Sequence, residues 1–340
     1  MKSVVIDEPG SVRLNEIAEP ELKSDEVLLG IQYIGLCGSD LSAYRGLSPL
    51  VTYPRIPGHE VSGIIVNKGA AVPETFQIGD KVSANPYTSC GVCPACRLGR
   101  LNTCEFNQTL GVQRDGALSQ YFAISYNKIL KSNKLTAQEF SLVEPLSVGY
   151  HAANRGQVTE IDTVLVIGCG MIGIGAIVAA LRKGATVIAI DPDDEKLELV
   201  KSFGVKYTIN ANEGDIAKRV KDITNGEGAN VCIEAVGLAS TYVLAVDAAA
   251  FAGRVVYIGY AKKEVKFNTS LFVKKELTIC GSRNALFEFT PVIQMLEERL
   301  MPFEKLISKI YPLNETPFAL EEWNSRPGDF IKILIDVKVS

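Results

Sequence analysis

The sequence predicts an α/β protein in which a doubly wound parallel sheet is joined to a β-rich domain. Residues 148–285 alternate short apolar runs with helix-like segments such as 240–250, which is typical of a parallel sheet covered by helices. The runs expected to be strands are 164–167, 185–190, 231–236, 254–258 and 277–280. Residues 1–147 instead contain short alternating segments broken by Gly and Pro, which predict an irregular antiparallel β domain.

Chain length and the C-terminal segment define the remaining organisation. With 340 residues, 47% of them apolar, the chain exceeds the size of about 250–300 residues at which one core stops growing, so two domains are expected. Residues 286–340 contain a plausible helix, 290–300, and a strand, 331–337. This segment is small for a domain, so we expect it to return to the first domain. The strands expected there are 27–34, 61–66 and 81–84.

Charge and hydropathy exclude several classes of protein. The net charge is −4, and the 35 basic and 39 acidic residues are evenly spread, which argues against nucleic-acid binding and against a polybasic membrane surface. The N-terminus, MKSVVIDEPG, lacks the long apolar core of a signal peptide, so we expect a cytoplasmic protein. Residues 164–181 are eighteen uncharged residues, the length of a transmembrane helix, but their four glycines predict a strand, a turn and a helix instead.

Four cysteines within fifteen residues predict a structural metal site. Their spacing is C-x2-C-x2-C-x7-C, and it offers four thiolates to one tetrahedral ion. The last cysteine comes too late, and without a following proline, for a bacterial ferredoxin cluster, and nothing indicates the oxidising compartment that disulfides need. Zinc is therefore favoured at Cys90, Cys93, Cys96 and Cys104.

A glycine-rich turn after the strand 164–167 predicts a dinucleotide site. Gly168, Gly170 and Gly173 form G-x-G-x-x-G, which includes Met171 and Ile172 and places a pyrophosphate at a helix N-terminus. A second apolar run ends in Asp191, eighteen residues beyond Gly173, where a carboxylate would accept from the adenosine ribose and repel a 2′-phosphate. Lys196 is the only basic residue nearby, and no arginine is in place to bind the 2′-phosphate of NADP, so NAD is favoured over NADP. Asp193 or Asp194 is also expected to cap the next helix.

A second group of potential metal ligands is more scattered. Cys37 stands in GLCGSD, His59 and Glu60 in PGHE, and Glu144 in EPLSVGYHA. A catalytic zinc needs about three protein ligands and an open position for substrate. The chain has only two histidines, so such a site would have to combine imidazole with thiolate and carboxylate. Taken singly, a cysteine such as Cys37 is more often a buried free cysteine, and a histidine such as His59 is more often structural.

Taken together and in this order, the CGSD, GHE, four-cysteine, EPLSVG and G-x-G-x-x-G elements resemble the zinc-dependent medium-chain dehydrogenase/reductase family over the whole chain. The segment around Glu144 resembles the polyol and sorbitol dehydrogenase branch. The resemblance implies a GroES-like catalytic domain over 1–147, a Rossmann NAD-binding domain over 148–285, and a C-terminal segment, 286–340, that rejoins the catalytic domain.

The resemblance also implies roles for individual residues. A catalytic zinc would be bound by Cys37, His59 and the carboxylate of either Glu60 or Glu144, giving two zinc ions per chain. Hydride would pass from a zinc-polarised alcohol to NAD, and Ser39 would relay the proton. The family's relay histidine is replaced by Ser42, which leaves the proton exit open.

Further residues are assigned from the same resemblance or from the local sequence. His151 is expected to be structural, and Cys169, Cys232 and Cys280 are interpreted as core residues. Residues expected near a substrate cleft are Tyr44, Arg45, Arg283 and Asn284.

These observations predict an NAD-dependent zinc dehydrogenase that acts on a secondary alcohol of a polyol, sugar or sugar acid. The substrate would be a small polyhydroxylated molecule, and we expect a homodimer or homotetramer. A threonine-type amino-acid alcohol dehydrogenase shares the same motifs and is an alternative. A zinc-stabilised nucleotide-binding protein without turnover is a second one, but it would not need Cys37, His59 and Glu144 together.

Overall fold

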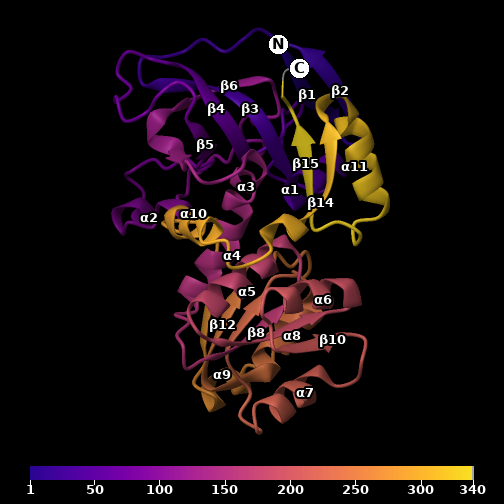
Figure 1. Ribbon diagram of the computed structural model, residues 1–340. Coiled ribbons are helices and arrows are strands. Elements are labelled where there is room, and N and C mark those ends of the chain that lie inside the picture. Colours follow the sequence, from indigo (N-terminus) through magenta and orange to yellow (C-terminus); the bar gives the residue numbers. More distant parts are fainter. Residues whose placement is uncertain (339–340) are drawn as a thin grey trace. The chain divides into compact units, whose positions relative to one another are not determined.

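In the computed structural model, which describes residues 1–338, the chain forms two separately packed units (Figure 1). The first contains residues 1–144 and the chain from 289 onward, and the second contains residues 145–288. The boundaries expected from the sequence, after residues 147 and 285, lie within a few residues of these divisions. No helix of the described residues is both long and apolar enough to cross a membrane.

The first unit is built on a large, mainly antiparallel sheet with the strand order β14-β15-β3-β4-β5-β7, in which β6 also pairs with β3. A separate antiparallel pair, β1 and β2, lies apart from it. The strands are β1 (Lys2–Glu8), β2 (Ser11–Glu16), β3 (Glu26–Leu36), β4 (Glu60–Lys68), β5 (Lys81–Ala84), β6 (Tyr121–Ser125), β7 (Ile129–Lys131), β14 (Ile307–Pro312) and β15 (Lys332–Asp336).

The C-terminal segment completes this sheet. β15 pairs antiparallel with β3, with Ile333 opposite Leu36 and Asp336 opposite Tyr33, and β14 runs parallel to β15. In Figure 1 these yellow strands lie beside the indigo N-terminal strands. The alternating apolar residues of β3 and β4, among them Leu29 and Ile65, are fully buried in the core that both ends of the chain share. The helices are α1 (Gly38–Tyr44), α2 (Pro94–Arg97), η1 (Leu101–Thr103), η2 (Tyr126–Lys128), α3 (Ala137–Phe140), α10 (Phe289–Glu297), η3 (Phe303–Leu306), η4 (Leu313–Glu315) and α11 (Thr316–Ser325).

The second unit is a parallel sheet with the order β10-β9-β8-β11-β12-β13. Counted along the chain this is 3-2-1-4-5-6, the order of a dinucleotide-binding sheet, and it confirms the predicted α/β class. The order reverses between β8 and β11, where such sheets bind their ligands. The strands are β8 (Thr163–Ile167), β9 (Thr186–Asp191), β10 (Tyr207–Asn210), β11 (Ala229–Glu234), β12 (Ala249–Tyr257) and β13 (Thr278–Gly281).

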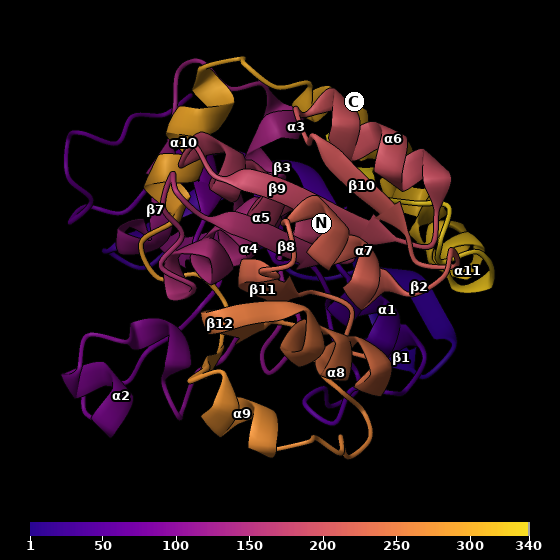
Figure 2. The same ribbon diagram turned by 90° about the horizontal axis from the view of Figure 1, so that it is seen from below.

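Helices cover both faces of this sheet. Figures 1 and 2 show α5 and α6 on one side and α7 and α8 on the other. Gly149 of α4 allows close packing on α5, because a Cβ there would lie 2.2 Å from the Ile172 carbonyl oxygen. The helices are α4 (Val143–Arg155), which begins at the end of the first unit, α5 (Met171–Arg182), α6 (Asp194–Ser202), α7 (Ile216–Ile223), α8 (Ala239–Ala248) and α9 (Ser270–Lys274).

Two expectations need correction. The strand expected to reach Val236 ends at Glu234, because Oε1 of that side chain accepts hydrogen bonds from the Val236 and Gly237 amides and stabilises a turn. Cys280 is only half-buried, since β13 is an edge strand, whereas Cys169 and Cys232 are fully buried as expected.

Candidate functional site

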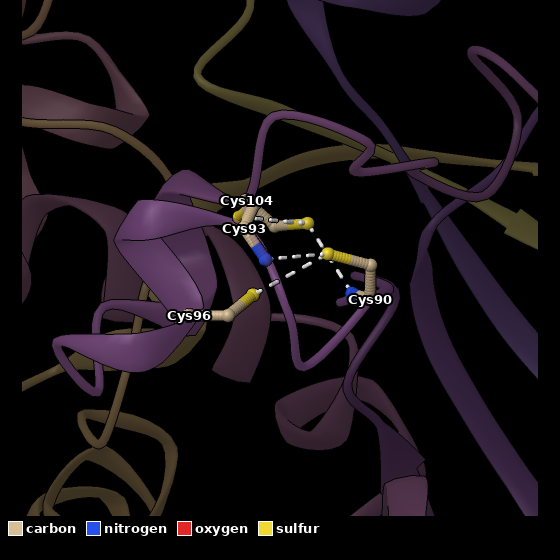
Figure 3. A group of neighbouring side chains, drawn as sticks. All are labelled: Cys90, Cys93, Cys96 and Cys104. Atoms are coloured by element: carbon tan, nitrogen blue, oxygen red, sulfur yellow. Dashed lines mark hydrogen bonds between the residues drawn. The ribbon is translucent and has the colours of Figure 1, made fainter.

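The four cysteines expected to share a metal converge in one lobe of the first unit. Cys93 is the N-cap of α2, Cys96 lies within that helix and Cys104 directly follows η1. Figure 3 shows the four side chains facing a common space. Their sulfur atoms all lie within 4.8 Å of one another.

The sulfur positions fit a tetrahedral zinc ion. The Sγ atoms of Cys90 and Cys96 are 4.0 Å apart, and those of Cys93 and Cys104 are 3.9 Å apart. Zinc–sulfur bonds of about 2.3 Å in a tetrahedron separate the sulfurs by about 3.8 Å. Backbone hydrogen bonds, above all from Glu105, lower the pKa of Cys93 to about 6, whereas burial raises the pKa of Cys96 to about 11. A bound cation would favour the thiolate form of all four.

Cys37 is positioned by a short, tightly capped helix. It is the N-cap of α1, and its amide donates to Asp40 Oδ2 at 2.8 Å. Asp40 is buried, and its other oxygen accepts from the Gly58 amide at 3.4 Å. Asp40 therefore links the segment that carries Cys37 to the residue that precedes His59.

Cys37, His59 and Glu60 form a second cluster, in which the potential ligand atoms lie within 4.8 Å of one another. His59 is 4% exposed and Glu60 is fully buried. His59 Nδ1 and Ser39 Oγ are buried without a hydrogen-bond partner among residues 1–338. Because buried polar atoms are nearly always paired, these two fit a site that a metal or another bound group completes.

Glu60 is held by a buried lysine. Lys332 Nζ, on β15, lies 2.6 Å from both carboxylate oxygens and also donates to the Leu36 carbonyl at 2.9 Å. Opposite Glu60 on β3 is Gly35, where a Cβ would lie 2.0 Å from Glu60 Oε2. Burial raises the pKa of Glu60 to about 7, against the lowering effect of the Lys332 charge. The absence of a side chain at Gly35 thus makes room for the ion pair.

Glu144 lies outside that 4.8 Å cluster but close to it. The hydroxyl of Tyr87, which is buried, donates to Glu144 Oε1. Burial lowers the pKa of His59, but the charges of Cys37, Asp40 and Glu144 outweigh this effect and raise the pKa well above its usual value. A metal ion would compete with that proton, because only the neutral imidazole binds metal.

In the second unit the glycine motif has the geometry that a pyrophosphate requires. Gly168 has a φ of +98°, and a Cβ on Gly173 would lie 1.8 Å from the Gly168 carbonyl oxygen, so the first glycine turns the chain and the third allows close packing. Gly170 faces open space and is the N-cap of α5, where no side chain caps the helix. Met171 and Ile172 begin that helix, and its first amides can therefore bind an anion.

Asp191 lies beside this turn at the end of β9. Its oxygens accept from the amides of Cys169 at 2.8 Å and Asp193 at 3.1 Å, and it lines a cavity of about 1020 Å³ together with Gly168. The Asp191 carboxylate, which can accept from a ribose hydroxyl, and the open cavity beside it fit the adenosine half of a dinucleotide. Asp193 caps α6 as expected, and Lys196 forms an ion pair with it at 3.6 Å.

The remaining residues expected near the substrate have varied surroundings. Arg45 Nε donates to Asn324 Oδ1 at 2.6 Å, so a substrate carboxylate would have to displace this contact. Tyr44 is half-buried against the core of the first unit, and Arg283 and Asn284 lie in the second unit beyond β13.

His151 is buried 2.9 Å from Glu288, which agrees with a structural role.

Sequence reasoning missed Lys332, Tyr87 and Asp40. Lys332 follows no motif and lies 272 residues from Glu60, so nothing local marks it. Asp40 could have been found, because an acid three residues after Cys37 is the pattern of a capping box.

Comparisons with known proteins show the family to which the chain belongs. A model of the alcohol dehydrogenase GroES-like domain matches residues 23–134, and a model of zinc-binding dehydrogenases matches residues 172–298. An uncharacterized zinc-type alcohol dehydrogenase-like protein from Haemophilus influenzae is 34% identical, with 98% of each chain covered. L-Galactonate-5-dehydrogenase from Escherichia coli is 31% identical, with 92% of each covered. A crystal structure of an alcohol dehydrogenase from Escherichia coli CFT073, complexed with NADH, has 30% identity and a TM-score of 0.92 over 99% of each chain.

The Glu60–Lys332 ion pair gives a first testable prediction. Lys332→Met leaves a buried carboxylate unpaired and should lower the free energy of unfolding by about 3–5 kcal/mol. The double variant Glu60→Gln/Lys332→Met removes both charges of the pair. It should therefore lower the free energy of unfolding by less than Lys332→Met alone. The chain's single tryptophan, Trp323, packs against the core of the first unit, so its fluorescence during urea unfolding reports on that unit.

Lys305→Met is the matched control, because Lys305 is exposed and should change stability by no more than about 0.5 kcal/mol. If Lys332→Met lowered the free energy of unfolding by no more than this control, the Glu60–Lys332 ion pair would not be a major source of stability in the first unit.

Proposed function

The chain belongs to the zinc-dependent medium-chain dehydrogenase family, and on this premise we propose that it oxidises a secondary alcohol of a polyol, sugar or sugar acid with NAD. The membership makes it an oxidoreductase that uses zinc and a nicotinamide cofactor. The observation that carries the proposal is the cluster of Cys37, His59 and Glu60 beside a second carboxylate, Glu144, with each carboxylate held by a different buried partner. The similarity to L-galactonate-5-dehydrogenase supports a polyhydroxylated substrate.

We assign Cys37, His59 and Glu144 as the ligands of the catalytic zinc. One thiolate and one carboxylate neutralise a divalent cation, and Glu60 with Lys332 forms a second neutral set. Both oxygens of Glu60 already contact Lys332, whereas Tyr87 donates only to Oε1 of Glu144 and leaves Oε2 for the metal. Zinc in this site would supply a Lewis acid that lowers the pKa of the substrate hydroxyl, and NAD would accept the hydride.

The protein's own groups orient the substrate and remove its proton. The Ser39 hydroxyl, buried and unpartnered among residues 1–338, can accept the proton that the alcohol loses and pass it on. Asp40 directly follows Ser39 and fixes the backbone of Cys37, three residues before it, so the thiolate and the hydroxyl are positioned by one helix start. With Ser42 in place of the family's histidine, water is the next carrier in this proposal.

In the lobe, the four cysteines are assigned to a second zinc ion with a structural role. Their sulfurs have tetrahedral spacing, and four thiolates would fill the coordination shell of a zinc ion, so no position would remain open for a substrate. Two zinc ions per chain follow from these assignments.

The substrate proposal is tested with a panel of alcohols and NAD, followed by NADH absorbance. Polyols, aldoses and aldonates should include the best substrates, with kcat/KM at least tenfold above that of simple alkyl alcohols. If alkyl alcohols or threonine were oxidised better than every polyhydroxylated compound, the substrate class would be wrong.

Metal analysis of freshly purified protein should find two zinc ions per chain. Cys104→Ala should lose one zinc and lower the thermal midpoint, because a structural site couples metal binding to folding. Cys37→Ala should lose the other zinc and all turnover while the fold persists. Cys280→Ala, a cysteine in neither cluster, should keep both ions. A single zinc in the unmodified chain, or an active Cys37→Ala variant, would refute the assignment.

Cofactor preference is the next test. NAD should exceed NADP by at least tenfold in kcat/KM, about 1.4 kcal/mol, because the Asp191 carboxylate repels a 2′-phosphate. Asp191→Asn keeps an acceptor for the Cys169 amide but removes the charge, and it should narrow the preference. Glu198→Gln, on the exposed side of α6, should leave the preference unchanged. Equal rates with the two cofactors in the unmodified protein would contradict the proposal.

A further inference from the structure

Two cations near the candidate catalytic site, Arg114 and Lys128, have no acidic partner in the described part of the chain, residues 1–338. Both are half-buried. Arg114 Nε is buried without a hydrogen bond, and within residues 1–338 no carboxylate lies within ion-pair distance of either side chain. Asp115, the neighbouring acid, is already engaged by Arg55 at 2.9 Å and by the Ile56 amide at 3.2 Å.

The two cations lie close enough to affect each other. Burial lowers the pKa of both, and the charge of Arg114 lowers the pKa of Lys128 further. Placing two desolvated like charges together without an anion costs free energy. An anion bound between them would repay that cost, and a guanidinium binds a carboxylate or phosphate through two parallel hydrogen bonds.

Arg114 belongs to a loop that is attached to the segment before His59. The Gly116 amide donates to the Ile56 carbonyl at 2.7 Å, and the Ala117 amide to the Gly58 carbonyl at 2.9 Å. A Cβ on Gly111 would lie 2.7 Å from the Gly58 amide nitrogen, so the loop packs directly against the residue before His59.

Lys128 is linked to the same site from the other side. Its Nζ donates to the Tyr87 carbonyl at 2.7 Å, and the hydroxyl of the same tyrosine donates to Glu144. One tyrosine residue therefore separates the ammonium group from a proposed zinc ligand.

We propose that Arg114 and Lys128 bind an anionic group, carboxylate or phosphate, on the polyhydroxylated substrate. This inference rests on the proposed function and deepens it. Arg45, which was expected near the substrate, is less suited to this role, since its guanidinium is bonded to Asn324 in α11. Arg114 and Lys128 determine specificity and take no part in hydride or proton transfer.

The test compares matched substrates in the zinc-loaded protein with NAD. Hexitols, hexonates and hexitol phosphates of gluco, galacto and manno configuration differ only in the group at one end of the chain. The unmodified protein should prefer an anionic series, and the better of the two identifies the anion as carboxylate or phosphate. Arg114→Gln and Lys128→Gln should each lower kcat/KM for that series at least tenfold, mainly through KM, and change kcat/KM for hexitols less than twofold.

Arg326→Gln, an exposed arginine of the first unit, is the matched control and should affect no series. Equal losses for neutral and anionic substrates, or no loss with either variant, would overturn the inference. If one variant failed to fold, the other would carry the test.

A binding measurement separates this inference from the proposed function. If none of these compounds were oxidised, the proposed function would fail. Calorimetric titration of the NADH-loaded protein with a hexonate and a hexitol phosphate would then decide the inference alone. Binding that either variant weakens tenfold supports it, and the absence of binding to the unmodified protein refutes it.

Discussion

The buried ion pair between Glu60 and Lys332 is the constraint around which the first unit is organised. Glu60 begins β4 and Lys332 begins β15, so the pair joins strands from opposite ends of the chain beside Cys37. Two charges removed from water require close geometry, and here the lysine contacts both carboxylate oxygens while Gly35 leaves the space they occupy. The C-terminal segment therefore supplies the charge that compensates the buried Glu60 carboxylate, in addition to completing the sheet.

Every proposed ligand of the catalytic zinc is supported by a second group. Asp40 holds the amide of Cys37, the Pro57–Gly58 segment before His59 packs on the 111–116 loop, and Tyr87 holds Glu144. Such support fixes ligand orientation before the metal arrives, which lowers the cost of binding it. Arg114 belongs to the same loop, and Lys128 donates to the carbonyl of the same tyrosine. The groups that orient the proposed metal ligands therefore also position the proposed anion site.

How much could be predicted from the sequence depended on distance along the chain. The residues of the cysteine lobe and of the glycine turn lie together in the structure, and the sequence could indicate this because they are local and their spacing fixes their geometry. The parallel sheet itself, though not its strand order, was predicted from the alternating apolar runs. Lys332 could not be predicted, since its partner is 272 residues away and a lysine in a strand is usually solvated. Tyr87 and Arg114 were missed for the same reason, because their function depends on contacts between loops.

X-ray absorption at the zinc edge of the Cys104→Ala variant, which should retain only the catalytic ion, tests the central claim most directly. One sulfur at about 2.3 Å with nitrogen and oxygen at about 2.0–2.2 Å is the result expected for Cys37, His59 and Glu144. A shell with two or more sulfurs, or one with none, would contradict a centre built from one thiolate, one imidazole and one carboxylate.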